Sequence, residues 1–183
     1  MHWKHPLMLY MVPFLLVGGS LAIITNAAIA SGINGHINMK GAIVETPCAI
    51  DVGDQEQTLM IGNFPISQII RDGQGVEKEF SIRLFDCVLT SLAPPQSGWK
   101  HFQVTFEGDA DNGNFKTIGD ANGVAIMIRD QQGNIAVPGA PLPKGEITPG
   151  NMQLRYTLNL VGNKENLRAG SYSSTIRFRM DYN

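Results

Sequence analysis

Two cysteines carry the clearest chemistry in this chain. Cys48 and Cys87 are the only cysteines among its 183 residues. In an oxidising compartment, two such cysteines form a disulfide by default. The alternative is a pair of free or metal-binding thiols. Neither cysteine belongs to a Cys-x-x-Cys pair and no histidine cluster accompanies them, so a metal ion would lack its remaining ligands. The sequence therefore favours one disulfide between the two.

Other reactive side chains do not assemble into a recognisable site. His36 and His101 lie outside any His-Glu-x-x-His pattern, and no serine occupies a Gly-x-Ser-x-Gly turn. Three aspartates have part of the spacing of a calcium loop, but glycine stands where a ligand is expected and asparagine stands where glycine is needed, which favours a solvated turn. They are Asp109, Asp111 and Asp120. We expect no enzymatic activity, metal, cofactor or small-molecule substrate.

Composition points to a folded domain without affinity for polyanions. Hydrophobic residues make up 43% of the chain and charged residues 16%, and the formal net charge is -2. Nucleic acid is therefore not an expected partner. The chain also contains 20 glycines and 10 prolines, which favours short strands and turns over long helices.

The first 30 residues have the layout of a secretory signal peptide. Lys4 precedes an apolar stretch from Leu7 to Ile24, and the small-residue sequence Ala-Ile-Ala ends at Ala30. An uncleaved membrane anchor is the alternative, although Pro13 weakens the stretch as a spanning helix. Residues 1–30 are therefore expected to direct export, which places the cysteines in an oxidising compartment.

Apolar residues alternate along the rest of the chain with the two-residue period of β-strands. Glycine, asparagine, aspartate and proline cluster between these segments, as turns require. No internal repeat or composition shift divides the chain further. The sequence predicts one all-β sandwich domain over residues 42–183. The alternation is clearest at residues 80–85, 102–107, 124–128 and 154–160.

The two ends of the exported chain have complementary patterns. The final segment has one apolar face and no strand after it to cover that face. The opposite end, residues 31–41, forms a spare arm with apolar or small residues at alternate positions, although its later part could instead be the first strand of the domain. We expect the domain to be completed by the arm of another copy or a relative. The arm positions are Ile33, Gly35, Ile37 and Met39.

Three segments resemble the pilin subunits of chaperone-usher pili. The first leads through alternating apolar residues into Cys48, and the second is a strand ending at Cys87. The third combines Gly170, an alternating strand and a penultimate tyrosine, Tyr182. Together they extend the resemblance over essentially all of the exported chain. The segments are residues 37–48, 80–87 and 170–183.

The resemblance implies an incomplete immunoglobulin-like β-sandwich of six strands that lacks its final strand. A periplasmic chaperone would donate a strand and hold the terminal carboxylate, and at an outer-membrane usher the arm of a neighbouring pilus subunit would replace it. Gly35 would be the small arm residue required where the groove is narrow, unless Asn34-Gly35 is a turn. The protein would reach the cell surface as part of the pilus. The implied groove residues are Gly170, Tyr172, Ile176, Phe178, Met180, Tyr182 and Asn183.

Within that family, residues 133–136 and 156–182 are most similar to the subunit that anchors and terminates the rod of P pili. The terminator's groove has no open starting site for another arm. The present arm is shorter and lacks the terminator's tryptophans, which leaves a rod or adaptor role open. A host-binding tip subunit is a further alternative, but tip subunits normally carry an additional lectin domain. Trp99 would be its contact residue, unless it is a half-buried aromatic at the start of a strand.

Overall fold

The computed structural model describes residues 36–43, 45–92 and 98–183. The chain divides into two compact units, Met1–Gly41 and Ala42–Asn183. The expected signal peptide, Ile33 and Gly35 lie outside the described residues. In the first unit, residues 36–41 form neither helix nor strand. Among the residues that the structure describes, no helix has the length and apolar character needed to cross a membrane.

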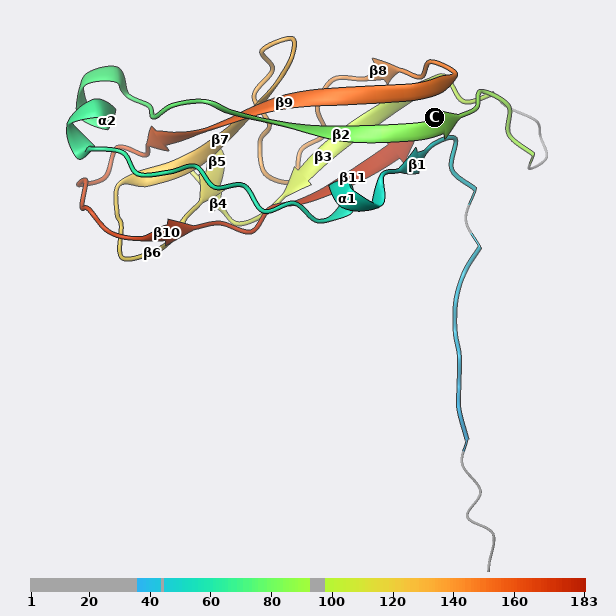
Figure 1. The fold of residues 1–183 in the computed structure, drawn as a ribbon, viewed down its shortest axis with the longest axis horizontal. Helices are drawn as coiled ribbons and strands as arrows, with labels where there is room; N and C mark the ends of the chain where they lie inside the picture. Colours follow the sequence, from blue (N-terminus) through green and yellow to red (C-terminus); the bar gives the residue numbers. More distant parts are fainter. Residues whose placement is uncertain (1–35, 44, 93–97) are drawn as a thin grey trace, which may run out of the picture. The chain divides into compact units, whose positions relative to one another are not determined.

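The larger sheet of the second unit is antiparallel and contains most of the predicted strands (Figure 1). The alternation at residues 80–85 lies in its second strand, where Ile82 and Leu84 are fully buried. Its neighbour continues the pattern, so that Phe80 lies opposite Tyr156. In spatial order the strands are β1 (Ala49–Ile50), β2 (Lys78–Cys87), β9 (Gly150–Gly162), β7 (Val124–Asp130), β5 (Asn114–Lys116) and β4 (Ala110–Asp111).

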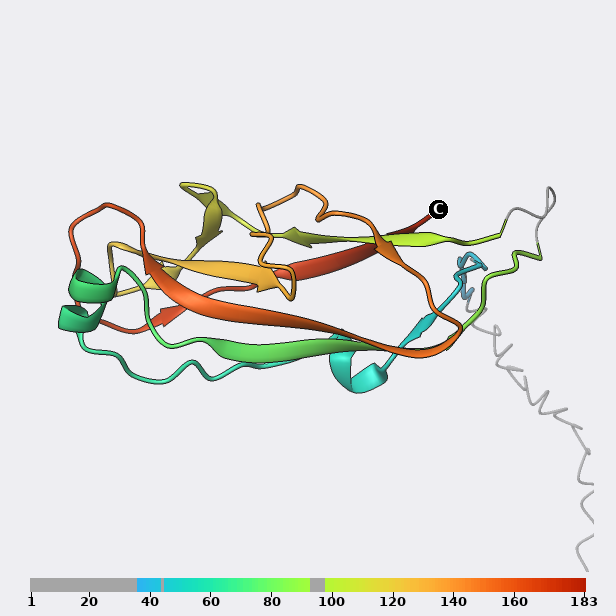
Figure 2. The same ribbon diagram turned by 90° about the horizontal axis from the view of Figure 1, so that it is seen from above.

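The second sheet faces the first across the core (Figure 2). Its order is β11 (Arg177–Tyr182), β3 (His101–Glu107) and β8 (Gly145–Glu146). A separate pair joins β10 (Tyr172–Ser173) to β6 (Ile118–Gly119). The alternating strand expected from Tyr172 to Met180 is therefore divided into two strands, and that expectation was wrong. The first part pairs with β6 and the second with β3, and the chain changes partner between them.

Two short helices, which the sequence did not predict, flank an extended segment. The first, α1 (Val52–Gln55), begins after Asp51, whose side chain accepts a hydrogen bond from Gly53 N. The second, α2 (Ile66–Asp72), ends at Gly73, whose φ of 71° lies in the left-handed region that glycine adopts readily. Together they hold residues 56–65 between two fixed points.

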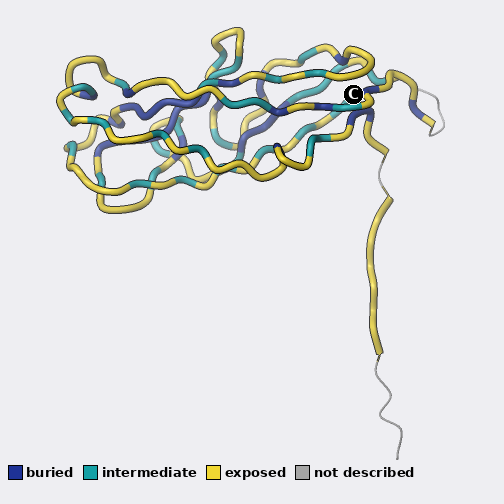
Figure 3. Tube along the Cα trace, viewed as in Figure 1, coloured by how far each residue is buried: buried dark blue, intermediate teal, exposed yellow. Residues whose placement is uncertain are grey.

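The core lies between the two sheets and includes a group of three aromatic rings. Phe80 stacks on Tyr156 with ring centroids 5.3 Å apart, and Phe106 meets both rings edge to face. Burial, followed by the nearby charge of Asp130, raises the pKa of the Tyr156 phenol. Figure 3 shows buried residues concentrated along the strands and exposed residues in the connections. The aromatic group therefore joins β2, β3 and β9 across the sandwich.

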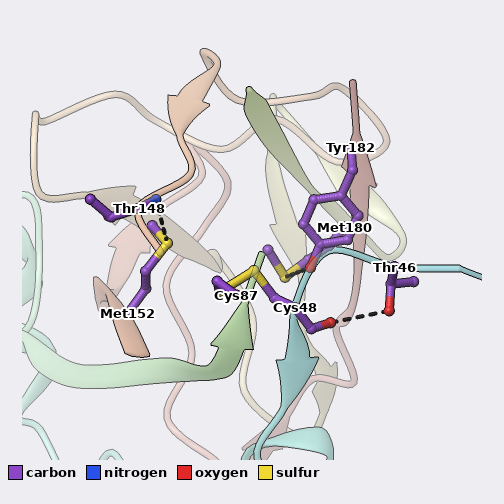
Figure 4. Close-up of a disulfide and its surroundings, with 7 residues drawn as sticks. All are labelled: Thr46, Cys48, Cys87, Thr148, Met152, Met180 and Tyr182. Atoms are coloured by element: carbon purple, nitrogen blue, oxygen red, sulfur yellow. Dashed lines mark hydrogen bonds between the residues drawn. A yellow bond between two sulfur atoms is a disulfide. The ribbon is translucent and has the colours of Figure 1, made fainter. Parts of the chain in front are cut away.

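A disulfide joins Cys48, just before β1, to Cys87 at the end of β2, and confirms the predicted pairing (Figure 4). Both cysteines are buried, with exposed fractions of 4% and 3%. The bond spans a sequence separation of 39 residues. In the chain-entropy account, a crosslink of this span stabilises the fold by about 4 kcal/mol.

Candidate functional site

A long groove runs along the domain, and residues from both sheets form its floor. Its volume is about 1060 Å³. The floor is apolar because strands of the two sheets direct their alternate side chains into it. The charged residues that line the groove, Asp54, Glu56 and Arg177, lie outside this floor, which suits an apolar guest. The floor residues are Phe80, Ile82, Phe106, Ile126, Ile128 and Leu158.

One wall of the groove consists of residues 170–178, from the segment before β10 into β11. Along residues 171–183 every second residue is half-buried and the others are exposed, which confirms the predicted alternation. Strand β11 pairs with β3 along one edge. Along its other edge, the described residues supply no strand. Backbone donors and acceptors of β11 therefore face the groove without a strand partner.

The opposite edge of this sheet is covered. The loop containing residues 136–147 runs alongside β3. Gly139 N donates to Phe106 O at 2.8 Å, and Leu142 N donates to Val104 O at 2.9 Å. Strand β8 pairs with the start of β3. Because the β3 edge is covered, β11 is the edge of this sheet that is open to another strand.

The second wall is residues 56–63, which form neither helix nor strand. Leu59 and Ile61 are half-buried against the core, whereas Met60 is 80% exposed. Within the described part of the chain, residues 57–63 make no backbone-to-backbone hydrogen bond. Gln57 Nε2 donates to Ser81 O at 2.8 Å and attaches the wall to β2. Both walls thus present unpaired backbone to the groove.

An ion pair anchors the start of this second wall. Asp54 is 6% exposed, and its Oδ2 accepts hydrogen bonds from Arg83 N and Arg83 Nε, each at 2.8 Å. Its Oδ1 accepts a third from Arg83 Nη2 at 3.0 Å. The side-chain bonds from Arg83 lower the pKa of Asp54, against the opposing effect of burial. The anchor therefore fixes α1 to β2 directly before the wall begins.

The predicted residues of the final segment separate into two groups. Gly170, Tyr172, Ile176 and Phe178 line the groove. Met180 and Tyr182 do not line the groove. They pack against the core, and Figure 4 shows both of them beside the disulfide. Asn183 continues the pairing with β3, where its N donates to His101 O at 3.0 Å.

Gly170 has a steric reason to be glycine. An added Cβ would lie 2.5 Å from Ala121 N and 2.7 Å from Asp120 Cβ. Ala121 N donates to Ser171 O at 3.0 Å, which holds the two segments together. The glycine permits this close approach at the end of the groove.

The described arm residues expose their apolar side chains. Ile37 is 87% exposed and Met39 is 92% exposed. Ile43, two positions beyond Gly41 on the same alternating face, is 104% exposed. The boundary of the arm at residue 41 stays a prediction.

The remaining polar and aromatic candidates have structural partners. Trp99 is half-buried and meets Tyr182 edge to face, with centroids 6.4 Å apart. Asp111 accepts a hydrogen bond from Asn163 Nδ2 at 2.7 Å, and Asp120 accepts one from Ser171 Oγ at 3.0 Å. No group of three or more potential metal ligands occurs in residues 36–43, 45–92 and 98–183.

The family of the chain follows from comparison with known proteins. The family model described as "Fimbrial protein" matches residues 37–183. The chain belongs to the fimbrial protein family. This fimbrial subunit is 31% identical over 151 residues to two Escherichia coli proteins, the PRS and PAP fimbrial minor pilin proteins. Each alignment covers 81% of this chain and 77% of the relative.

A solved structure shares the fold of the fimbrial subunit. The crystal structure of the P pilus rod subunit PapA superposes with a TM-score of 0.64, at 18% identity, over 75% of this chain and all of PapA. The expected pilin fold and family are therefore confirmed. The protein is a structural subunit of a chaperone-usher fimbria, exported through the periplasm to the cell surface, and it contacts other pilus subunits there.

Proposed function

We propose that the groove accepts a β-strand from a second polypeptide, and that the arm of this subunit enters the groove of a neighbour. The observation that carries the proposal is the open edge of β11 beside an apolar floor. A guest strand would pair with that edge and place alternate side chains on the floor. Four or five such side chains would contribute on the order of 10 kcal/mol before ordering costs.

The donated strand of this subunit comprises residues 31–43. This extends the predicted arm by one alternating position, because Ile43 is as exposed as Ile37 and Met39. Ile33 and Gly35 complete the same face in the sequence. Gly35 is the position where a small residue is needed. The six alternate positions of the arm are residues 33, 35, 37, 39, 41 and 43.

Before assembly the groove requires a temporary guest, because an open strand edge promotes nonspecific pairing. We assign this role to a periplasmic chaperone, which would also contact Asn183, and assign the exchange of strands to an outer-membrane usher. Membership of the fimbrial protein family supports both assignments. The subunit acts as a structural link without catalytic activity, cofactor, nucleic acid or small-molecule substrate.

Within the pilus, we assign the subunit a minor role that anchors or terminates the rod. The support is its 31% identity to two minor pilin proteins over 81% of the chain. The alternative is a rod or adaptor subunit, which the shared fold with PapA leaves open. To separate these roles, the chaperone-bound subunit is challenged with synthetic arms of sibling subunits. A terminator refuses exchange while its own arm still enters another subunit, whereas a rod or adaptor exchanges.

Strand acceptance is tested with a synthetic peptide of residues 31–43 added during refolding of the chain 31–183. We expect a stable complex with the native peptide and with an Asn38→Asp peptide. An Ile37→Asp peptide should not bind, because its carboxylate would enter the apolar floor. Equal binding of the two aspartate peptides would refute the assigned donor face.

A further inference from the structure

Tyr172 connects the two walls at one end of the groove. Its hydroxyl donates to the carbonyl oxygen of Gly62 at 3.5 Å, across a sequence separation of 110 residues. Among the hydrogen bonds of the described residues, it is the only one that joins residues 56–63 to residues 170–178. This end of the groove is thus bridged by a side chain, whereas the rest of its length is open.

Tyr172 is supported from the side away from the groove. Strand β10 pairs with β6, and Tyr172 lies opposite Gly119. An added Cβ at Gly119 would collide with the carbonyl of Ser171, so the two backbones approach closely here. The hydrogen bond from Ser171 Oγ to Asp120 Oδ2 adds to this support. The tyrosine therefore has little freedom to retreat from the groove.

Residues 57–63, on the other side of the contact, are free of backbone hydrogen bonds to the rest of the described chain. Gly62 has a φ of 92°, a left-handed conformation that only glycine adopts easily. This wall is therefore the side that can move when the contact breaks. Burial raises the pKa of Tyr172, which keeps its hydroxyl a neutral donor.

We propose that Tyr172 is a gate residue whose contact with Gly62 stabilises the empty groove and slows insertion of a donated strand at this end. The inference depends on the proposed strand acceptance. A guest strand that reaches this end must lie between the two walls, which separates the tyrosine hydroxyl from the Gly62 carbonyl. The separation is part of the barrier to insertion.

The test measures how fast a fluorescent peptide of residues 31–43 binds to the refolded chain 31–183. Tyr172→Phe removes only the hydroxyl and leaves the ring. Tyr182→Phe is the matched control, because the Tyr182 hydroxyl contacts Met180 Sδ of its own strand at 3.8 Å and does not cross the groove. The chain's own arm competes with the peptide in every sample, so the three chains are compared at the same chain concentration and over a series of peptide concentrations.

We expect Tyr172→Phe to bind the peptide roughly three to ten times faster than the native chain, the effect of losing one hydrogen bond in the empty state. The control should stay within about twofold of the native rate, because its contact lies within one strand. Unchanged association in Tyr172→Phe, with clear peptide binding, would overturn the gate alone. Absence of a peptide complex in all three chains, both after refolding and when the peptide is added during refolding, would overturn strand acceptance, and the gate with it. A complex that forms only during refolding would overturn the gate alone.

Discussion

The anchor between Asp54 and Arg83 gives the sharpest prediction on stability. In Asp54→Asn the side chain keeps its size but loses its charge, and its amide group faces the three Arg83 donors that the carboxylate now satisfies. Breaking a fully buried ion pair costs about 3–5 kcal/mol. Because the Arg83 side chain is 48% exposed and can bind water, we expect a smaller loss of about 2 kcal/mol.

The same anchor predicts a pH dependence. The pKa of Asp54 is lower in the folded state than in the unfolded state. The contribution of Asp54 to the free energy of unfolding is therefore complete above its unfolded-state pKa of about 3.9. That contribution is lost as the pH falls through the lower, folded-state pKa. We expect the native chain and Asp54→Asn to differ most near neutral pH. Their unfolding free energies should converge below about pH 4.

Urea titrations of the chain saturated with the 31–43 peptide, monitored by Trp99 fluorescence, measure the difference in unfolding free energy between the native chain and Asp54→Asn. Asp72→Asn is the control, since it changes the same group in an exposed pair with Arg71, whose side chain is 70% exposed. The control should lose less than about 1 kcal/mol. If Asp54→Asn loses no more than Asp72→Asn, or if its pH profile runs parallel to that of the native chain, the anchor does not hold the wall.

Three further substitutions test other features. Replacing both cysteines by alanine should lower the free energy of unfolding by about 4 kcal/mol in urea titrations, and a loss under about 1 kcal/mol would contradict the role of the crosslink. Gly170→Ala should cost about 2 kcal/mol in the same titrations, because its Cβ meets the backbone of Ala121. Gly41→Ala, where no atom lies within 4 Å of the added Cβ, should leave stability unchanged, and equal effects would disprove the steric argument. Phe178→Ala should weaken binding of the 31–43 peptide about tenfold in fluorescence titrations, as half the cost of truncating a buried phenylalanine. Arg179→Ala, at an exposed position outside the groove lining, should not weaken it, and similar losses from both would argue against the assigned inner face.

The sequence predicted the strands whose alternation reflects one buried face. Residues 80–85 follow this rule because the strand lies between the core and solvent. At residues 102–107 the predicted inner face is correct, but Thr105 on the other face is buried as well. The disulfide was also predictable, since export leaves two cysteines and one partner for each. The prediction of which β11 residues face inward was also correct, because half-buried and exposed residues alternate along that strand.

Other features depend on contacts between distant residues and leave little local signal. The division into β10 and β11 arises because Tyr172 pairs with Gly119 while Arg177 pairs with Glu107. Helices α1 and α2 have four and seven residues, too few to establish a helical period. The wall at residues 56–63 makes no regular pairing, and its position depends on the Asp54 anchor, which no local pattern reveals.

The loop over the outer edge of β3 has a consequence for the geometry of the fibre. With that edge covered, the three-stranded sheet keeps one open edge, that of β11, for a donated strand. Under the proposed function each subunit accepts one strand there and donates one arm. It then has one predecessor and one successor, so the fibre grows linearly and without branches.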